Sequence, residues 1–292
     1  MEHAHTILED SLESGNRKPF WKYIKAKKKD NIGVTPIKDK GQLYSDSQTK
    51  AELLSKQFKS VFTQENTDEP LPKIPGKEYT KINRLDITTA GVQKLLANLN
   101  TNKASGPDGL PNKIMKTCAE ELAPAITDIY KRSLTTGTLP SDRRNANVSP
   151  IFKKGNKHEA SNYRPVSLTS VCCILLEHII CIPILKHLKN NSILIHLQYG
   201  FRSSHSCESQ LIITLNDIMN IFDSKIQTDL IILDFSKTFD TEPHRKLLHK
   251  LNHYGIDGME REQRVIVEGE FSSSVKKTVN SEVPQRTVLG PL

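Results

Sequence analysis

The fold of this chain is decided by the stretch Leu230-Ile231-Ile232-Leu233-Asp234-Phe235-Ser236-Lys237-Thr238-Phe239-Asp240. Four aliphatic residues in a row, bounded by polar ones, predict a buried strand. A carboxylate at the end of such a strand costs free energy to bury unless something pairs with it, and a divalent metal ion is one such partner. The alternative is that Asp234 caps the next element of secondary structure.

Four further motifs flank this stretch. They are Asn162-Tyr163-Arg164-Pro165-Val166-Ser167-Leu168-Thr169-Ser170, Gln198-Tyr199-Gly200-Phe201-Arg202, Pro243-His244-Arg245 and Val283-Pro284-Gln285-Arg286-Thr287-Val288-Leu289-Gly290-Pro291-Leu292. In this order and spacing, the five motifs closely resemble the reverse transcriptase of non-LTR (LINE-type) retrotransposons. The resemblance covers about Ser105 to Leu292. It implies an RNA-directed DNA polymerase, a nucleotidyltransferase that uses Mg²⁺, deoxynucleoside triphosphates, an RNA template and a DNA primer.

Composition is consistent with a nucleic-acid partner. The 292 residues suffice for one large or two ordinary domains, and 41 Lys and Arg against 33 Asp and Glu give a net charge of +8. A basic chain favours polyanions, nucleic acid before membrane, because neutralising phosphates releases counterions. The alternative is ordinary surface lysine, which gives the same count.

Cysteine usage and the apolar segments predict an intracellular protein of the cytoplasm or nucleus. The five cysteines form no Cys-x-x-Cys pair, which favours reduced thiols over a zinc site or disulfides. The N-terminus lacks the apolar region of a signal peptide. The most apolar segment, 171–188, is interrupted by polar residues and Pro183, so we expect no transmembrane helix. No protein partner can be identified from these features.

The pattern of elements predicts an α+β fold, because helices are interrupted by strands and the key acid lies on a strand. Helices are predicted at 47–62, from a cap at Thr88 or Thr89 to Leu99, at 114–134 with a bend or restart at Pro124, and at 171–188, 208–222 and 243–254. Strands are predicted at 148–152 and 230–233, with a hairpin at 264–270 and 276–280. The resemblance implies the fingers and partial palm of a right-hand polymerase. We therefore divide the chain into a mostly helical N-terminal extension and linker (1–103), a fingers region (104–225) and a partial palm (226–292).

By resemblance, Asp234 is the catalytic carboxylate and binds the metal ions, with the backbone carbonyl of Phe235 as a second oxygen ligand. Phe239 matches the aromatic residue that packs under the incoming sugar and excludes a 2′-hydroxyl; the alternative is a core phenylalanine. Asp240 would lie on the same strand face as Asp234 but about 20 Å away, so a helix cap is the better interpretation for it.

Several basic and polar residues resemble substrate-binding positions of the family. Lys153, Lys154 and Arg164 resemble the fingers residues that hold the triphosphate. Gln285 matches the Pro-Gln-Gly element of the template–nucleotide pocket, although Arg286 replaces the glycine and would obstruct a close backbone approach. Arg202 matches a template contact. Taken singly, each cation could equally be a surface charge.

The segment 20–29 interleaves aromatic residues with lysines, a mix suited to stacking on bases and following a phosphate backbone. Its candidate nucleic-acid contacts are Lys22, Lys25, Lys27, Lys28 and Lys29. The alternative is a solvated basic helix end or linker.

The resemblance also implies two adjacent aspartates after the last motif, and no Asp-Asp pair occurs in these 292 residues. The sequence therefore reads as a reverse transcriptase fragment that ends within the palm, and we expect it to be inactive by itself. The alternative is a non-catalytic, basic remnant that binds RNA.

Overall fold

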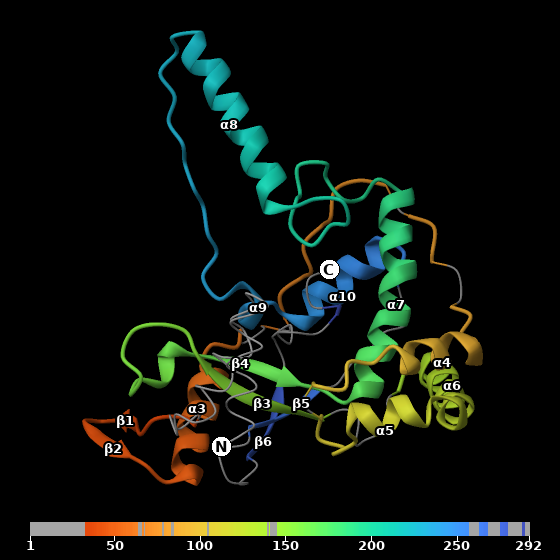
Figure 1. Cartoon of the computed structure of the whole chain (residues 1–292). Helices are drawn as coiled ribbons and strands as arrows, with labels where there is room; N and C mark the ends of the chain where they lie inside the picture. Colours follow the sequence, from red (N-terminus) through yellow and green to blue (C-terminus); the bar gives the residue numbers. More distant parts are fainter. Residues whose placement is uncertain are drawn as a thin grey trace, which may run out of the picture.

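A mixed sheet with helices beside it makes up the body of the molecule, and one long helix projects from it (Figure 1). The computed structural model describes residues 33–63, 66, 68–77, 79–82, 85–103, 105–138, 140, 145–256, 263–267, 275–279 and 288–289. Helices and strands alternate along the chain, so the predicted combination of helix and sheet is confirmed.

The sheet has four strands in the order β4-β3-β5-β6. These strands are β3 (Asn145–Phe152), β4 (Tyr163–Leu168), β5 (Gln263–Val267) and β6 (Val275–Val279). Strand β3 pairs antiparallel with β4 and parallel with β5, and β5 pairs antiparallel with β6. The predicted hairpin near the C-terminus is confirmed, and β3 begins three residues before its predicted start.

The sequence did not predict strand β4, because Pro165 interrupts it. A proline cannot donate to a sheet ladder and is tolerated at an edge. Strand β4 is an edge strand, and Pro165 lies opposite Pro150 in the register. Neither proline has an N–H to donate, so these two opposite residues exchange no ladder hydrogen bond.

The N-terminal part packs against this sheet. Strands β1 (Ile37–Asp39) and β2 (Gln42–Tyr44) form a hairpin that the sequence did not predict. Its turn residues, Lys40 and Gly41, both have positive φ, as a tight two-residue hairpin requires. Helix α3 (Ser47–Lys59) follows, three residues shorter than predicted. One apolar cluster joins these elements to the sheet: Ile37, Ala51, Leu54, Phe58, Val148 and Tyr163.

The larger core lies among the helices α4 (Thr89–Ala97), α5 (Asn112–Thr117), α6 (Ala119–Thr136) and α7 (Val171–Asn190). The predicted cap is confirmed, because the Thr88 hydroxyl accepts from the Gly91 N–H. The predicted restart at Pro124 is wrong: one helix ends and the next begins at Cys118, and Pro124 lies inside α6. Proline at this position costs the helix one hydrogen bond, the one that an N–H at 124 would make to the Glu120 carbonyl.

Helix α7 is the centre of this core. It buries eight residues, and the Tyr130 hydroxyl on α6 donates to the Cys172 carbonyl over 2.7 Å. Among the described residues, α7 alone is long and apolar enough to cross a membrane, by length and composition only. Half of its most apolar window is buried inside the molecule, and a core helix of a globular protein passes the same test.

Helix α8 (Cys207–Asp223) projects away from the body, and the chain returns beside it as an irregular segment (Figure 1). The predicted strand at 230–233 is therefore wrong: these residues form no strand, and Ile232 is 83% exposed. A strand exists only where a neighbour supplies hydrogen-bond partners, and no described strand pairs with this segment.

After this segment come α9 (Thr238–Thr241) and α10 (His244–His253), the latter preceded by Pro243 as predicted. The segment 69–76, which contains Pro70, Pro72 and Pro75, lies against α10. Arg245 donates to the Glu69 carbonyl, and the His249 ring contacts the Pro72 carbonyl. Gly255, at φ 76°, ends the helix where a Cβ would lie 2.4 Å from the Thr80 carbonyl oxygen, so only glycine fits.

Candidate active site

The predicted triphosphate-binding cations lie on one hairpin, formed by β3 and β4. Lys153 and Lys154 follow β3 directly, Arg164 lies on β4, and all three side chains are exposed. Arg164 is opposite Ile151, and the Lys153 N–H donates to the Asn162 carbonyl. This pairing puts Lys153 and Arg164 on one face at diagonal positions, typically about 7–8 Å apart. Two cations at that spacing can share one phosphate group.

The turn that follows β3 is held by its own side chains. Asn162 donates from Nδ2 to the Asn156 carbonyl and to the Glu159 carboxylate. Gly155 has φ 90°, and a Cβ there would lie 2.9 Å from the Asn162 amide nitrogen. The basic turn is thus preorganised, which reduces the entropy lost when it binds an anion.

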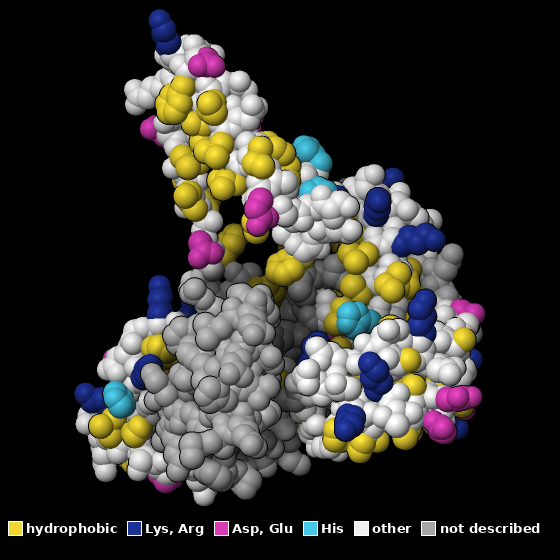
Figure 2. All heavy atoms as spheres, in the orientation of Figure 1, with side chains coloured by type: hydrophobic (Ala, Val, Ile, Leu, Met, Phe, Trp, Pro, Cys, Tyr) yellow, Lys and Arg dark blue, Asp and Glu magenta, His cyan; other side chains and the backbone are white. Residues whose placement is uncertain are grey.

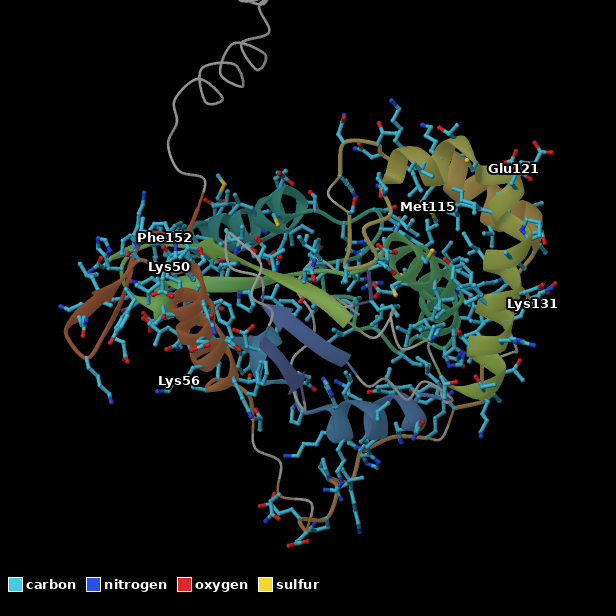
Figure 3. All side chains as sticks on the ribbon, turned by 90° about the horizontal axis from the view of Figure 1, so that it is seen from below. Lys50, Lys56, Met115, Glu121, Lys131 and Phe152 are labelled. Carbon is cyan, nitrogen blue, oxygen red and sulfur yellow. The ribbon has the colours of Figure 1, made fainter. Side chains whose placement is uncertain are left out.

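The N-terminal part braces the same turn from outside, a role that the sequence did not predict. The Lys38 N–H donates to the His158 carbonyl over 2.7 Å, and the His158 ring contacts the Pro36 carbonyl. Thr35 and Tyr163 both donate their hydroxyls to the Lys157 carbonyl. In Figure 3, Lys50 of α3 and Phe152 at the end of β3 lie in this same region. The contacts from Thr35, Pro36 and Lys38 cross 120 or more residues, so no local signal in the sequence could have predicted them.

The predicted cap role of Asp240 is wrong, because Lys237, at φ 54°, is the N-cap of α9. Asp240 lies in the first turn, where the helix dipole favours a negative charge. Its helix α9 adjoins β4, since one small pocket of about 30 Å³ is lined by residues of α3, β4 and the α9 region, among them Tyr163, Lys237 and Asp240. Phe239, on α9, is 37% exposed. The strand that carries Arg164 and the helix that carries Phe239 therefore lie next to each other.

Asp234 is exposed in the irregular segment after α8, and its neighbour Phe235 is 82% exposed. Among the described residues, no three His, Cys, Asp or Glu side chains gather into a group that could hold a metal ion. The carboxylates as arranged do not fit a Mg²⁺ site, so we derive no catalytic step through a metal here. Metal binding by Asp234 and by the Phe235 carbonyl stays a prediction.

The remaining predicted contacts are not brought to this hairpin. Arg202 donates from Nη1 to the Ile195 and Gln198 carbonyls, so its guanidinium ties its own loop together. Contact with a template stays a prediction for it. The lysines of 22–29 and Gln285 lie outside the described residues.

The basic turn after β3, strand β4 and helix α9 lie in the part of the chain that a known family model matches, whereas the brace at 35–38 lies outside it. The family model described as "Reverse transcriptase (RNA-dependent DNA polymerase)" matches residues 151–292. Residues 151–292 therefore resemble a reverse transcriptase domain. The match begins at the end of β3 and so includes Lys153, Lys154, Arg164, Asp234 and Gln285.

Curated relatives point to the non-LTR class. "Probable RNA-directed DNA polymerase from transposon BS" of Drosophila melanogaster is 25% identical over 288 residues, which cover 94% of this chain and 32% of that protein. "RNA-directed DNA polymerase from mobile element jockey" of Drosophila funebris is 27% identical over 213 residues, 70% of this chain and 23% of that protein. The chain thus spans about a quarter to a third of the length of these relatives. The predicted resemblance to LINE-type reverse transcriptases is confirmed.

Proposed function

We propose that this reverse transcriptase domain contributes template and nucleotide binding to an RNA-directed DNA polymerase of a non-LTR retrotransposon. Its substrates would be deoxynucleoside triphosphates, an RNA template and a DNA primer, with Mg²⁺ as the cofactor that the family implies. Residues 104–225 would form the fingers and residues 226–292 part of the palm of a right-hand polymerase, and residues 1–103 the N-terminal extension. The family match over residues 151–292 carries this proposal.

Within that proposal, each exposed cation of the β3–β4 hairpin has a distinct part. Arg164 can donate two parallel hydrogen bonds to a phosphate, whereas Lys153 and Lys154 act as point charges. Phe239 on the adjoining α9 would contact the sugar and select against a 2′-hydroxyl. Gln285 would line the template–nucleotide pocket, and Arg202 and the lysines of 22–29 would contact nucleic acid.

A second function, RNA binding without catalysis, is favoured by one observation. The 292 residues contain no Asp-Asp pair, and the described carboxylates form no metal-binding group. Catalysis with two metal ions requires ligands for both. We therefore expect a protein of residues 1–292 to extend no primer on an RNA template with Mg²⁺ or Mn²⁺. Extension above background that Asp234→Ala abolishes would contradict this expectation.

Salt-dependent RNA binding tests the hairpin. We expect the triple variant Lys153→Ala, Lys154→Ala, Arg164→Ala to bind a single-stranded RNA more weakly and to lower the slope of log K against log salt by about 2 (three contacts at roughly 0.7 each). Lys131→Ala is the matched control, since Lys131 is exposed on the outer face of α6, away from the hairpin (Figure 3). Fluorescence anisotropy titrations between low and moderate salt measure both the RNA affinity and the slope of log K against log salt. An unchanged slope in the triple variant would remove the hairpin from the binding surface.

Nucleotide competition separates the two functions. On an RNA template with a DNA primer, a polymerase site should bind the next correct deoxynucleotide more tightly than the ribonucleotide, and Phe239→Ala should reduce that preference. RNA binding that persists with no deoxynucleotide preference would favour the second function.

A further inference from the structure

Glu177 is a buried carboxylate that the proposed binding site does not use. It lies on α7, is 2% exposed, and its neighbours Leu175, Leu176 and Ile180 are buried. Burial of a carboxylate among apolar side chains is costly unless hydrogen-bond donors surround it. A hydrogen-bond donor to Glu177 therefore offsets part of this burial cost, and removing the contact should be unfavourable.

One such group comes from the far end of the chain. The Val288 N–H donates to Glu177 Oε2 over 2.7 Å, across 111 residues of sequence. A backbone amide bound to a carboxylate makes a short, charge-assisted hydrogen bond. The next residue, Leu289, packs against the same apolar core as α7. A polar and an apolar contact at consecutive residues thus dock this segment onto α7.

We propose that Glu177 is a positioning residue that docks Val288 and Leu289, the part of the Gln285 motif that the structure describes, against α7. Gln285 precedes Val288 by three residues, which span at most about 11 Å of extended chain. A group that holds the Val288 amide therefore acts within three residues of Gln285 in the sequence. Whether the Glu177–Val288 contact serves template and nucleotide binding rests on the proposed function. The contact itself does not depend on that function.

The hydrogen bond is what distinguishes this role from simple packing in α7. Glu177→Gln keeps an acceptor oxygen at the same reach. Glu177→Leu keeps a side chain of similar size and removes the acceptor. Glu177→Asp keeps the charge but withdraws the carboxylate by one methylene group. A positioning role predicts that Glu177→Gln behaves like the wild type. It predicts that Glu177→Leu and Glu177→Asp release Val288 and Leu289 from α7.

Two measurements follow the segment without RNA or nucleotide. Trypsin cleaves after Arg286, two residues before Val288, and hydrogen-exchange mass spectrometry resolves a peptide over 283–292. We expect Glu177→Leu to raise both the cleavage rate and the exchange rate roughly tenfold. Glu177→Asp should raise both by a smaller factor, and Glu177→Gln should leave both within about twofold of the wild type.

Glu121→Leu is the matched control, because Glu121 is exposed and points away from the body on α6 (Figure 3). Circular dichroism checks that each variant keeps its helices; should Glu177→Leu unfold, the comparison of Glu177→Asp with Glu177→Gln decides. Unchanged rates in the folded Leu and Asp variants would overturn the proposal. So would an equal rise in Glu177→Gln, since that variant retains the acceptor. Because neither measurement needs polymerase activity, failure of the proposed function leaves this result standing.

Discussion

Helices α7 and α8 are built from similar residues and have opposite surroundings. Both are rich in Leu and Ile, and both begin with a serine that caps the first turn through its hydroxyl. Helix α7 packs against other elements and buries eight residues, whereas α8 buries none. Figure 2 shows the consequence, with apolar side chains gathered along the projecting α8. The periodicity of apolar residues thus predicts a helix. It does not predict which elements pack against that helix and bury it.

The exposed apolar surface extends from α8 into the segment that follows it. Leu211, Ile212, Leu215, Met219 and Phe222 of α8 are each about half to two-thirds exposed, and Leu233 reaches 87%. Contiguous apolar surface of this kind favours association. The comparison with α7 therefore predicts differences in protection, stability and reactivity.

The largest expected difference is in backbone protection. An isolated helix of this length is marginal in water, whereas amides of a buried helix exchange only through large openings of the structure. We expect amides of α8 and of 226–235 to exchange at least about a thousandfold faster than those at the centre of α7. Hydrogen-exchange mass spectrometry on monomeric protein measures this. If α8 is as slow as α7, something covers it in solution, and light scattering would show whether that is a second copy.

The next difference is in the cost of truncating a leucine. Leu176 of α7 is 4% exposed and Leu215 of α8 is 49% exposed. Leu176→Ala leaves a cavity in the core and should lower the free energy of unfolding by about 2–5 kcal/mol. Leu215→Ala should change it by less than about 0.5 kcal/mol. Urea denaturation of the two variants measures both values, and equal costs would mean that α8 has a packing partner.

The part of the fold that sequence predicted is the part that local chemistry determines. The helix at α8 was predicted within one residue at each end, because Ser206 and Ser209 satisfy its first N–H groups from adjacent positions. The hairpin of β5 and β6 was likewise predicted from alternating residues close in sequence. Neither prediction required knowledge of what the element packs against.

Predictions failed where the outcome depends on distant residues. Leu230–Leu233 has the composition of a buried strand, yet no described strand pairs with it. Strand β4 forms despite Pro165 because it lies at an edge beside β3. At the candidate site, the exposed cations of the hairpin could be named from the sequence. The brace from Thr35 to Lys38 could not, because its contacts cross more than 120 residues.

A smaller change in the free energy of unfolding is expected when one polar contact of the α7 core is removed. Tyr130 is 1% exposed, and its hydroxyl donates to the Cys172 carbonyl. Tyr130→Phe removes the donor and should lower the free energy of unfolding by about 1–2 kcal/mol. Tyr44→Phe is the control, because the Tyr44 hydroxyl makes only a long, exposed contact of 3.4 Å to Gln42. Thermal denaturation compares the two, and an equal loss in both would show that burial of the hydroxyl has no effect.

The smallest effect concerns the thiols of the two helices. Burial, and after it the negative charge of Glu177, raises the pKa of the Cys181 thiol on α7, whereas Cys207 at the start of α8 is exposed. Because the thiolate is the reactive form, a raised pKa means less thiolate at any pH below it. We expect iodoacetamide to modify Cys181 at least about tenfold more slowly than Cys207 near pH 8, with a rate that keeps rising to a higher pH than for an ordinary thiol. Glu177→Gln removes the charge but not the burial, so it should shift the profile of Cys181 only part of the way to lower pH, about a twofold acceleration at pH 8. Peptide mass spectrometry after timed alkylation resolves the two sites. Equal rates at Cys181 and Cys207 would mean that α7 opens as readily as α8, and the contrast between the two helices would not hold in solution.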